Sequence, residues 1–237
     1  MDKLLETHGL VKQFGGFKAV SNVDLSVDAG EVRCIIGPNG AGKSTFLRLA
    51  VGFYEPTAGS IYFKNEDISS LPFYRRIVKG LGVKFQAPGV FPTLSAEENL
   101  LVALQRTTSS ENLRAELDRL MDLIGLDSQR QDLAQNLSHG QQQWLDIGMA
   151  MGSHPELLLL DEPTAGMSPA ETFRTGVLVQ KLNAEGVTII AIEHDMEFVR
   201  QIAHKVTVFH YGKVFREGSI SSVEADRDVM RIYLGNA

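Results

Sequence analysis

Gly37-Pro38-Asn39-Gly40-Ala41-Gly42-Lys43-Ser44 is the stretch that decides the fold of this 237-residue chain. It fits the pattern G-x-x-x-x-G-K-[ST], in which glycines let backbone N–H groups turn towards phosphate oxygens. Lys43 would place a positive charge beside the β and γ phosphates, and Ser44 would offer a hydroxyl to Mg²⁺. The helix that follows, which includes Thr45, would point its positive end at the same anion. The stretch therefore predicts a site for a nucleoside triphosphate.

The segments on either side of this stretch supply the strand and the helix that the motif requires. An apolar run precedes it at 32–36, and an amphipathic run follows it at 45–50. A GTPase would also need an Asn-Lys-x-Asp motif, and no asparagine in this chain is followed by lysine. A dinucleotide-binding protein would need G-x-G-x-x-G, which the stretch does not provide.

The composition is that of an ordinary globular protein, with 43% hydrophobic and 22% charged residues. The 23 Lys and Arg residues against 29 Asp and Glu give a net charge of −6, which argues against a nucleic-acid partner. The single cysteine, Cys34, cannot form an internal disulfide and is expected to be buried. No run approaches the roughly 20 apolar residues of a membrane span. The N-terminus also lacks the apolar centre of a signal peptide, so we expect membrane contact only through a partner.

Strand patterns occur at both ends of the chain. Period-two or continuous apolar runs predict strands at 4–10, 23–27, 59–63 and 82–85, and again at 157–160, 187–192, 206–209 and 213–215.

The middle of the chain has the periodicity of helices. Helices are predicted at 96–105 and 111–124, the second with an apolar face suited to core packing, and a short one at 72–79. We therefore predict one domain, 1–237. Residues 1–86 and 152–237 would form an α/β core, and 87–151 an inserted helical subdomain.

Acidic residues follow the buried strand 157–160 directly. The carboxyl ends of parallel strands are where ligands bind in open α/β sheets. Asp161 is placed to hold Mg²⁺, and Glu162 to orient and polarise an attacking water. Two more polar residues follow predicted strands: Gln86 could reach Mg²⁺ or the water, and His194 could meet the γ-phosphate.

A second helix start occurs at Leu137-Ser138-His139-Gly140-Gln141. Ser138 is a good N-cap residue, and capping could be its whole role. The alternative is that this helix start faces a phosphate bound by another molecule.

These residues occur in the order and approximate spacing of the ATP-binding subunit of an ABC transporter, and the resemblance covers essentially the whole chain. It implies an α/β fold with a RecA-like mixed sheet, an N-terminal antiparallel β region and an inserted α-helical subdomain. It also implies ATP and Mg²⁺ as cofactors and a sandwich dimer. Ser138, Gly140 and Gln141 of one subunit would then act on the γ-phosphate held by the other.

The resemblance assigns further roles by position. Catalytic roles go to Glu162, His194, Gln86 and Lys43, and Mg²⁺ contacts to Ser44, Gln86 and Asp161. Phe14 matches the aromatic residue that stacks on adenine, and Val20 would line the same pocket. The remaining nucleotide contacts are the residues of the loop and its helix start: Gly37, Pro38, Asn39, Gly40, Ala41, Gly42, Lys43, Ser44 and Thr45.

Two positions depart from the family pattern. His139 stands where the signature has its first glycine, and Ser168 stands where an Asp usually closes the loop after the acidic strand. Together with Val83-Lys84-Phe85-Gln86 and the run 193–200, they resemble the branch that imports branched-chain amino acids and urea. The urea transporter subunit is the nearest match.

The expected partners are a second ATP-binding subunit, the same or different, and transmembrane permease subunits at the cytoplasmic face of the inner membrane. The Pro- and Gly-containing stretch 86–93 suits a hinge. Val90 and Phe91 are expected near the groove that receives a permease helix. The alternatives are the ATPase of an exporter, such as the one for lipopolysaccharide, and a soluble ABC ATPase without transport function.

Overall fold

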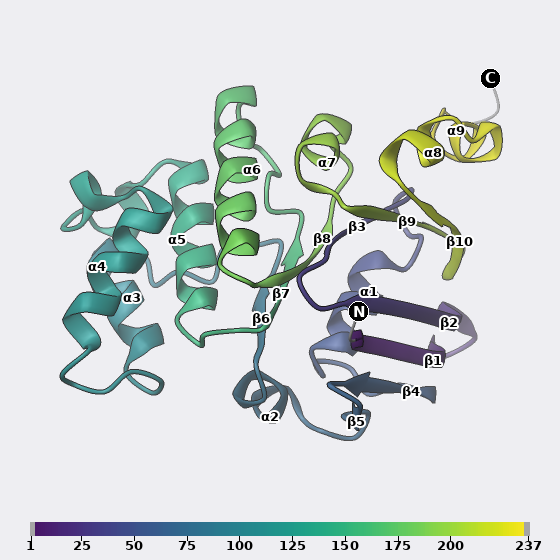
Figure 1. Cartoon of the computed structure of the whole chain (residues 1–237), viewed down its shortest axis with the longest axis horizontal. Coiled ribbons are helices and arrows are strands. Elements are labelled where there is room, and N and C mark those ends of the chain that lie inside the picture. The colour runs from purple at the N-terminus through teal and green to yellow at the C-terminus, as the bar shows by residue number, and fades with distance from the viewer. Residues whose placement is uncertain (1–2, 235–237) are drawn as a thin grey trace.

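A computed structural model describes residues 3–234 of the chain and contains two β-sheets (Figure 1). The first is antiparallel, with strand order β2-β1-β4-β5. Its strands are β1 (Lys3–Phe14), β2 (Phe17–Asp28), β4 (Ala58–Phe63) and β5 (Glu66–Asp67). β1 and β2 are longer than predicted because shifts in their pairing register interrupt the period-two pattern, one of them between Thr7 and Leu10.

The second sheet has six strands in the order β10-β9-β3-β8-β7-β6. Its five strands from β9 to β6 pair in parallel, and β10 pairs antiparallel with β9 at the edge. The strands are β3 (Val32–Ile36), β6 (Leu81–Lys84), β7 (Leu157–Asp161), β8 (Thr188–Ile192), β9 (Lys205–His210) and β10 (Lys213–Gly218). Every residue of β3, β7 and β8 is buried, as expected for parallel strands covered on both faces.

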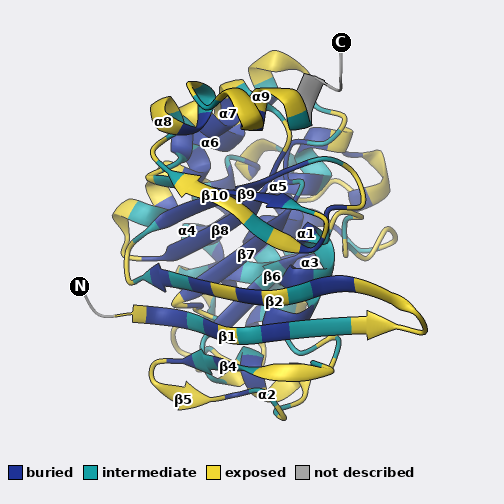
Figure 2. Cartoon of the chain, turned by 90° about the vertical axis from the view of Figure 1, so that its right-hand side faces the viewer, coloured by how far each residue is buried: buried dark blue, intermediate teal, exposed yellow. Residues whose placement is uncertain are grey.

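Two hydrophobic clusters lie on opposite faces of the six-stranded sheet. One includes Phe46, Leu47 and Phe63 and joins helix α1 (Lys43–Ala50) to both sheets. The other packs against helices α6 (Pro169–Ala184) and α7 (Met196–Ile202). The exposed residues lie mainly on outer elements such as β5, β10, α8 (Ile220–Glu224) and α9 (Arg227–Leu234) (Figure 2). Cys34 is buried, as predicted.

Three helices fill the middle of the chain and lie beside the sheet at the left of Figure 1. They are α3 (Ala96–Leu104) and α4 (Leu113–Ile124), close to the predicted ranges, and α5 (His139–Met151), which begins at the predicted helix start. Single 3₁₀ turns at Asp127–Gln129 and Ala134–Asn136 connect α4 to α5.

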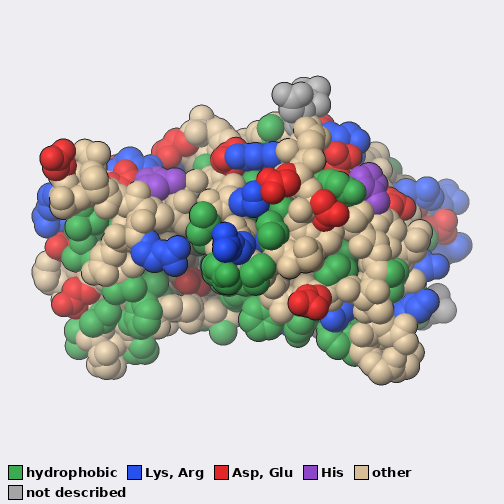
Figure 3. Space-filling view, turned by 90° about the horizontal axis from the view of Figure 1, so that it is seen from below, with side chains coloured by type: hydrophobic (Ala, Val, Ile, Leu, Met, Phe, Trp, Pro, Cys, Tyr) green, Lys and Arg blue, Asp and Glu red, His purple; other side chains and the backbone are tan. Residues whose placement is uncertain are grey.

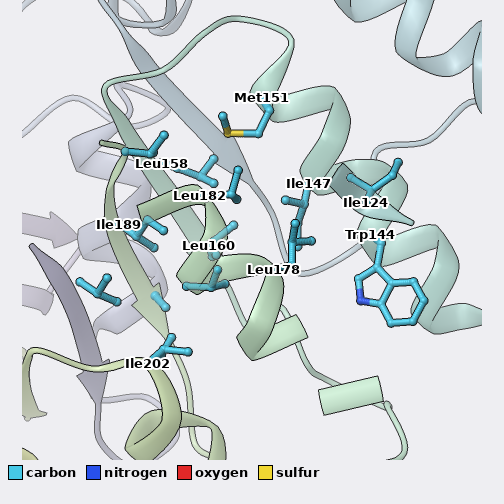
Figure 4. Packing of buried hydrophobic residues seen from close by; sticks show 14 of the residues in the cluster. Ile124, Trp144, Ile147, Met151, Leu158, Leu160, Leu178, Leu182, Ile189 and Ile202 are labelled. Atoms are coloured by element: carbon cyan, nitrogen blue, oxygen red, sulfur yellow. The ribbon is translucent and has the colours of Figure 1, made fainter. Parts of the chain in front are cut away.

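The helical region shares one hydrophobic cluster with the sheet. Figure 4 shows Ile124, Trp144 and Ile147 of the helical region together with Leu158 and Leu160 of β7. The division into an α/β core and a subdomain at 87–151 stays a prediction, because packing continues across that boundary.

A buried arginine closes the far end of α1. Helix α2 (Phe73–Val78) carries Arg76, whose guanidinium donates to the carbonyl oxygens of Leu49 and Ala50 at 2.7 and 3.0 Å. It also donates to the carbonyls of Ser69 and Leu71. These bonds satisfy carbonyl groups that a helix C-terminus leaves unpaired.

Candidate active site

The loop between β3 and α1 depends on glycine at its two ends. Gly37 has φ +147° and Gly42 has φ +101°. A β-carbon at Gly37 would overlap the carbonyl oxygen of Phe209, and one at Gly42 would overlap that of Ala19. Only glycine combines this backbone conformation with so close an approach of neighbouring main chain, so the spacing of the motif is set by sterics.

The N-terminus of α1 has no side-chain cap. Gly42 occupies the N-cap position and offers no group to the free N–H donors of the first turn. Lys43 is buried, and its Nζ donates to the carbonyls of Gly37 and Pro38 at 2.7 and 3.1 Å. Burial lowers the pKa of this amine, against the opposing effect of nearby carboxylates. The loop therefore presents unpaired N–H groups and one desolvated cation, which is the chemistry of an anion site.

A pocket opens over this loop. Its lining residues are Phe17, Ala19, Asn39, Gly40, Ala41, Gly42, Lys43, Ser44, Thr45 and Glu162. The acid that follows β7 thus shares one cavity with the loop, although more than a hundred residues separate them in the sequence.

Asp161 ends β7 directly beside the start of α1. The Ser44 hydroxyl donates to Asp161 Oδ1 at 3.1 Å, while Oδ2 is buried without a partner. Burial raises the pKa of this carboxyl, and the bond from Ser44 opposes that shift. A hydroxyl and a carboxylate with a free oxygen form the ligand pair that suits Mg²⁺ bound together with phosphates. The residues present therefore fit this ion.

Glu162 has a left-handed backbone with φ +49°, a conformation that non-glycine residues rarely adopt. The Gln86 side-chain nitrogen donates to Glu162 Oε2 at 2.7 Å. The bond joins the ends of β6 and β7 and brings Gln86 and Glu162, both of which follow strands, to the same edge of the sheet; the contact of Gln86 with Mg²⁺ or the water stays a prediction. Unusual backbone of this kind is concentrated at functional sites.

His194 follows β8 at the same edge of the sheet, and its side chain is largely exposed. Its neighbour Glu193, which the sequence analysis did not single out, is fully buried. The Glu193 carboxylate accepts from the N–H and hydroxyl of Thr164 at 3.1 and 2.7 Å, and from the N–H of His194 at 3.1 Å. Glu193 therefore fixes the loop after Glu162 relative to His194. Its place directly after an apolar strand could have identified Glu193 as a candidate site residue from the sequence.

Phe14 and Val20 were expected beside adenine, but neither of them lines the pocket. Phe14 is 44% exposed and packs edge to face on Tyr54, with 5.3 Å between the ring centroids. Its side chain does not line the pocket. Val20 is fully buried in the core, because alternation along β2 turns its neighbour Ala19 to the pocket instead. Phe17, which is 63% exposed, is the aromatic residue that lines the pocket.

The start of α5 is capped by its own side chains. Ser138 Oγ accepts from the Gln141 N–H at 3.2 Å, and Gln141 Oε1 accepts from the Ser138 N–H at 2.8 Å. This capping box confirms the predicted N-cap. Within residues 3–234, no hydrogen bond joins the segment 138–141 to the loop 37–44; its outward contacts go to the loop after β7 and to α6.

The comparison with known proteins decides the family. The sequence model described as ABC transporter matches residues 20–165, which contain the loop, the capped helix start and both acids. The chain belongs to the ABC transporter family. The protein is an ATPase subunit of such a transporter, and its fold is the ABC ATPase fold.

Curated relatives of this ABC transporter subunit span its full length. The high-affinity branched-chain amino acid transport ATP-binding protein BraF of Pseudomonas aeruginosa is 36% identical over 99% of this chain and 98% of its own length. The lipopolysaccharide export system ATP-binding protein LptB of Acidithiobacillus ferridurans is 33% identical over 100% and 98%.

Solved structures agree with this assignment. The ADP conformation of MJ1267, an ATP-binding cassette of an ABC transporter, is 31% identical and superimposes with a TM-score of 0.90 over 100% of both chains. A dimeric, post-hydrolysis state of the cassette MJ0796 bound to ADP and Pi is 27% identical, with a TM-score of 0.83 over 92% of this chain and 99% of that chain.

Across residues 3–234, the helices of this ABC transporter subunit are too short or too polar to span a membrane.

Proposed function

We propose that this ATPase subunit powers an importer of branched-chain amino acids or urea. The full-length similarity to BraF supports import and is higher than the similarity to LptB. The resemblance of the run 193–200 and of His139 and Ser168 to the urea branch supports urea as the narrower choice. The observation that carries the proposal is the pocket shared by the loop 37–44 and Glu162, with Asp161 behind it.

We assign the chemistry of hydrolysis to the residues around that pocket. Lys43 and the N–H groups of the loop, through Thr45, bind the β and γ phosphates. Ser44, Asp161 and Gln86 hold Mg²⁺, which neutralises phosphate charge when it is bound. Glu162 orients and deprotonates the attacking water, and the bond from Gln86 fixes its carboxylate.

His194 is the proposed contact to the γ-phosphate. Its exposed ring at the strand edge, with a backbone held by Glu193, is free to change partner when nucleotide binds. Phe14 is the proposed aromatic contact to adenine, and Phe17 is a second candidate because it lines the pocket.

The second half of each site is proposed to come from a second subunit. The loop 37–44 leaves one side of the pocket open, and the segment 138–141 begins a helix elsewhere on the same molecule. In a sandwich dimer, Ser138, Gly140 and Gln141 would face the γ-phosphate bound by the partner. The dimeric state of the similar cassette MJ0796 supports this arrangement.

The proposed permease site is a groove between α2 and α3. Its lining includes Tyr74 and Val78, which are 57% and 66% exposed, together with Ala103 and Arg106. Hydrophobic side chains gather on the face of the molecule seen from below, where α2 and the helical region lie (Figure 3). Phe91, at 45% exposure, lies within the stretch 86–93 and does not line this groove. The subunit would thus sit on the cytoplasmic face of the inner membrane, held there by the permease.

Transport assays test the proposal. Cells lacking this chain should lose uptake of labelled urea or of labelled leucine, and complementation should restore it. Loss of one solute alone fixes the substrate. Unchanged uptake of both would refute the import proposal, and a defect in lipopolysaccharide export in the same cells would favour the exporter.

A matched pair of variants tests the permease surface. Phe91→Asp should abolish uptake while ATP binding persists, because we expect Phe91 to contact the permease beside the groove, and burying a charge in that contact is costly. Phe173→Asp, on an exposed face of α6, is the control and should leave uptake unchanged. Normal uptake with Phe91→Asp would remove this residue from the permease contact.

A further inference from the structure

The ring of His139 lies between the start of α5 and the loop that follows β7. His139 is the first residue of α5, at the position where the family signature has glycine. Its Nε2 lies 2.9 Å from the carbonyl oxygen of Ala165. A carbonyl oxygen only accepts, so Nε2 carries the proton, and this holds for neutral and protonated imidazole alike.

Two further contacts fix the ring in this place. A β-carbon built on Gly166 would lie 3.4 Å from Cδ2 and Nε2 of the ring, so the imidazole packs on the bare backbone of that residue. The side-chain amide of the buried Gln143, one turn along α5, lies 3.2 Å from the same Nε2.

The residues on either side of His139 contact the start of α6. A β-carbon on Gly140 would clash with the Glu171 carboxylate. That carboxylate caps α6 by accepting from the N–H and hydroxyl of Ser168, at 2.9 and 2.8 Å. These two bonds, followed by the hydroxyl of Ser138, lower the pKa of Glu171. The capped starts of α5 and α6 therefore share one carboxylate.

The same two helices are joined again one turn further along. The Trp144 indole N–H donates to the Thr175 hydroxyl at 2.8 Å, and the Arg174 guanidinium lies 4.2 Å from the centre of the Trp144 ring. These contacts fix the helices to each other, and His139 at the start of α5 also contacts the loop 165–168.

We propose that His139 is a positioning residue that locks the segment 138–141 to the loop 165–168 of the same subunit. This inference rests on the proposed dimer, in which the segment 138–141 faces the partner's nucleotide. A glycine at position 139 has no side chain to make this bond. In this chain, the two segments are therefore presented to a partner as one rigid body.

The lock can be tested within a single subunit. The glutamine of His139→Gln places an amide N–H at the same number of bonds from the backbone as Nε2, whereas His139→Leu fills similar space without a donor. Amide hydrogen exchange in the segment 164–168 of the nucleotide-free subunit should rise at least about threefold in His139→Leu and His139→Gly. It should stay near the wild-type rate in His139→Gln. Equal exchange in all four proteins would overturn the proposal.

The effect on the dimer is the second test. In a Glu162→Gln background, the ATP concentration for half-maximal dimerisation should rise about tenfold with His139→Leu and return towards the parent value with His139→Gln. Binding of a fluorescent ATP analogue to the monomer should stay unchanged, and His8→Gln on β1 should match the parent. If the Leu and Gln variants needed the same ATP concentration for half-maximal dimerisation, the N–H donor at position 139 would have no role in the dimer. A parent that does not dimerise would refute the proposed dimer alone, since exchange in the single subunit tests the lock independently.

Discussion

Helices α1 and α5 both begin with a segment assigned to phosphate, but their first turns differ in which groups satisfy them. α1 starts at Gly42 with no side-chain cap, and its lysine is folded back onto loop carbonyls. α5 starts at Ser138 with a reciprocal capping box. The N–H donors at the start of α1 are free to bind an anion, whereas those at the start of α5 are already partly hydrogen-bonded by the capping side chains. From this difference we infer an order of events, in which nucleotide would occupy α1 first and α5 of a partner subunit would join later.

The largest expected effect concerns the α1 side of this comparison. Glu162→Gln keeps an oxygen for the bond from Gln86 but cannot take a proton from water. We expect turnover to fall by roughly 10²- to 10⁴-fold, the usual contribution of a general base, with ATP binding retained. Steady-state phosphate release and equilibrium nucleotide binding measure the two quantities.

The control for this variant is Glu156→Gln, which changes an exposed acid just before β7. Its turnover should match the wild-type value. Near-normal turnover of Glu162→Gln would assign the base to another group and weaken the view that α1 and β7 carry the chemistry.

A smaller effect is expected at the start of α5. Ser138→Asp preserves an N-cap, because aspartate caps helices as well as serine, but it adds a negative charge that would face a partner's phosphate. Thermal stability of the subunit should fall modestly, because the new carboxylate lies beside Glu171, to which the Ser138 hydroxyl is hydrogen-bonded. ATP-dependent dimerisation and turnover should fall roughly tenfold, which corresponds to about 1.4 kcal/mol.

Ser219→Asp is the control variant, because the Ser219 hydroxyl also accepts the N-cap hydrogen bond of a helix, α8. It should leave stability, dimerisation and turnover unchanged. If Ser138→Asp had no effect on dimerisation, capping would be the whole role of Ser138 and the contrast between the two helices would lose its functional meaning.

The last effect concerns the pH dependence of stability, not turnover, and arises further along α5. Asp146 is buried, and burial raises its pKa to about 6, against the backbone N–H of Gly89 and the charge of Lys84. Folding therefore disfavours its charged form. The resulting stability is fully present below the unfolded pKa near 4 and is lost as pH rises through about 6.

Asp146→Asn removes this titration while keeping an oxygen for Gly89. The stability difference between Asp146→Asn and the parent should grow in favour of Asn between pH 4 and pH 7, by up to about 3 kcal/mol. Urea unfolding at a series of pH values measures it. A difference independent of pH would show that Asp146 ionises in the folded subunit as it does in the unfolded chain.

The fold was predictable from the sequence where the residues of one segment are sufficient to determine its conformation. The run 37–44 is bounded by glycines that sterics require, and the strand 157–160 is uniformly apolar because both of its faces are covered. Helix α6 was not predicted, because its core side includes Thr172, Thr175 and Gly176, which give a weak apolar stripe. These polar residues are accommodated in the core side of α6 by tertiary contacts, such as the hydrogen bond from Trp144 to Thr175. A local sequence pattern does not indicate such contacts.

The candidate site was predictable where a strand end placed its residues. Asp161, Glu162, Gln86 and His194 all follow strands of one sheet, so topology alone brings them to one edge. The position of strand ends does not indicate whether Val20 or Phe17 lines the pocket. A register shift between Leu10 and Lys12 interrupts the pairing of β1 and β2 close by, so alternation did not indicate which side chain would face the pocket.

The buried Arg76 gives α1 a property that its own sequence does not contain. The helix has eight residues and is about 12 Å long, and burial lowers the pKa of Arg76 only to about 10, so it stays charged at neutral pH. A permanent cation thus sits on the carbonyl end, while the amide end is left for the anion. A neutral residue at position 76 would leave the carbonyls of Leu49 and Ala50 unsatisfied and loosen the platform on which the triphosphate rests. Substitutions at Arg76 should therefore resemble nucleotide-binding defects, although this residue lies at the opposite end of the helix.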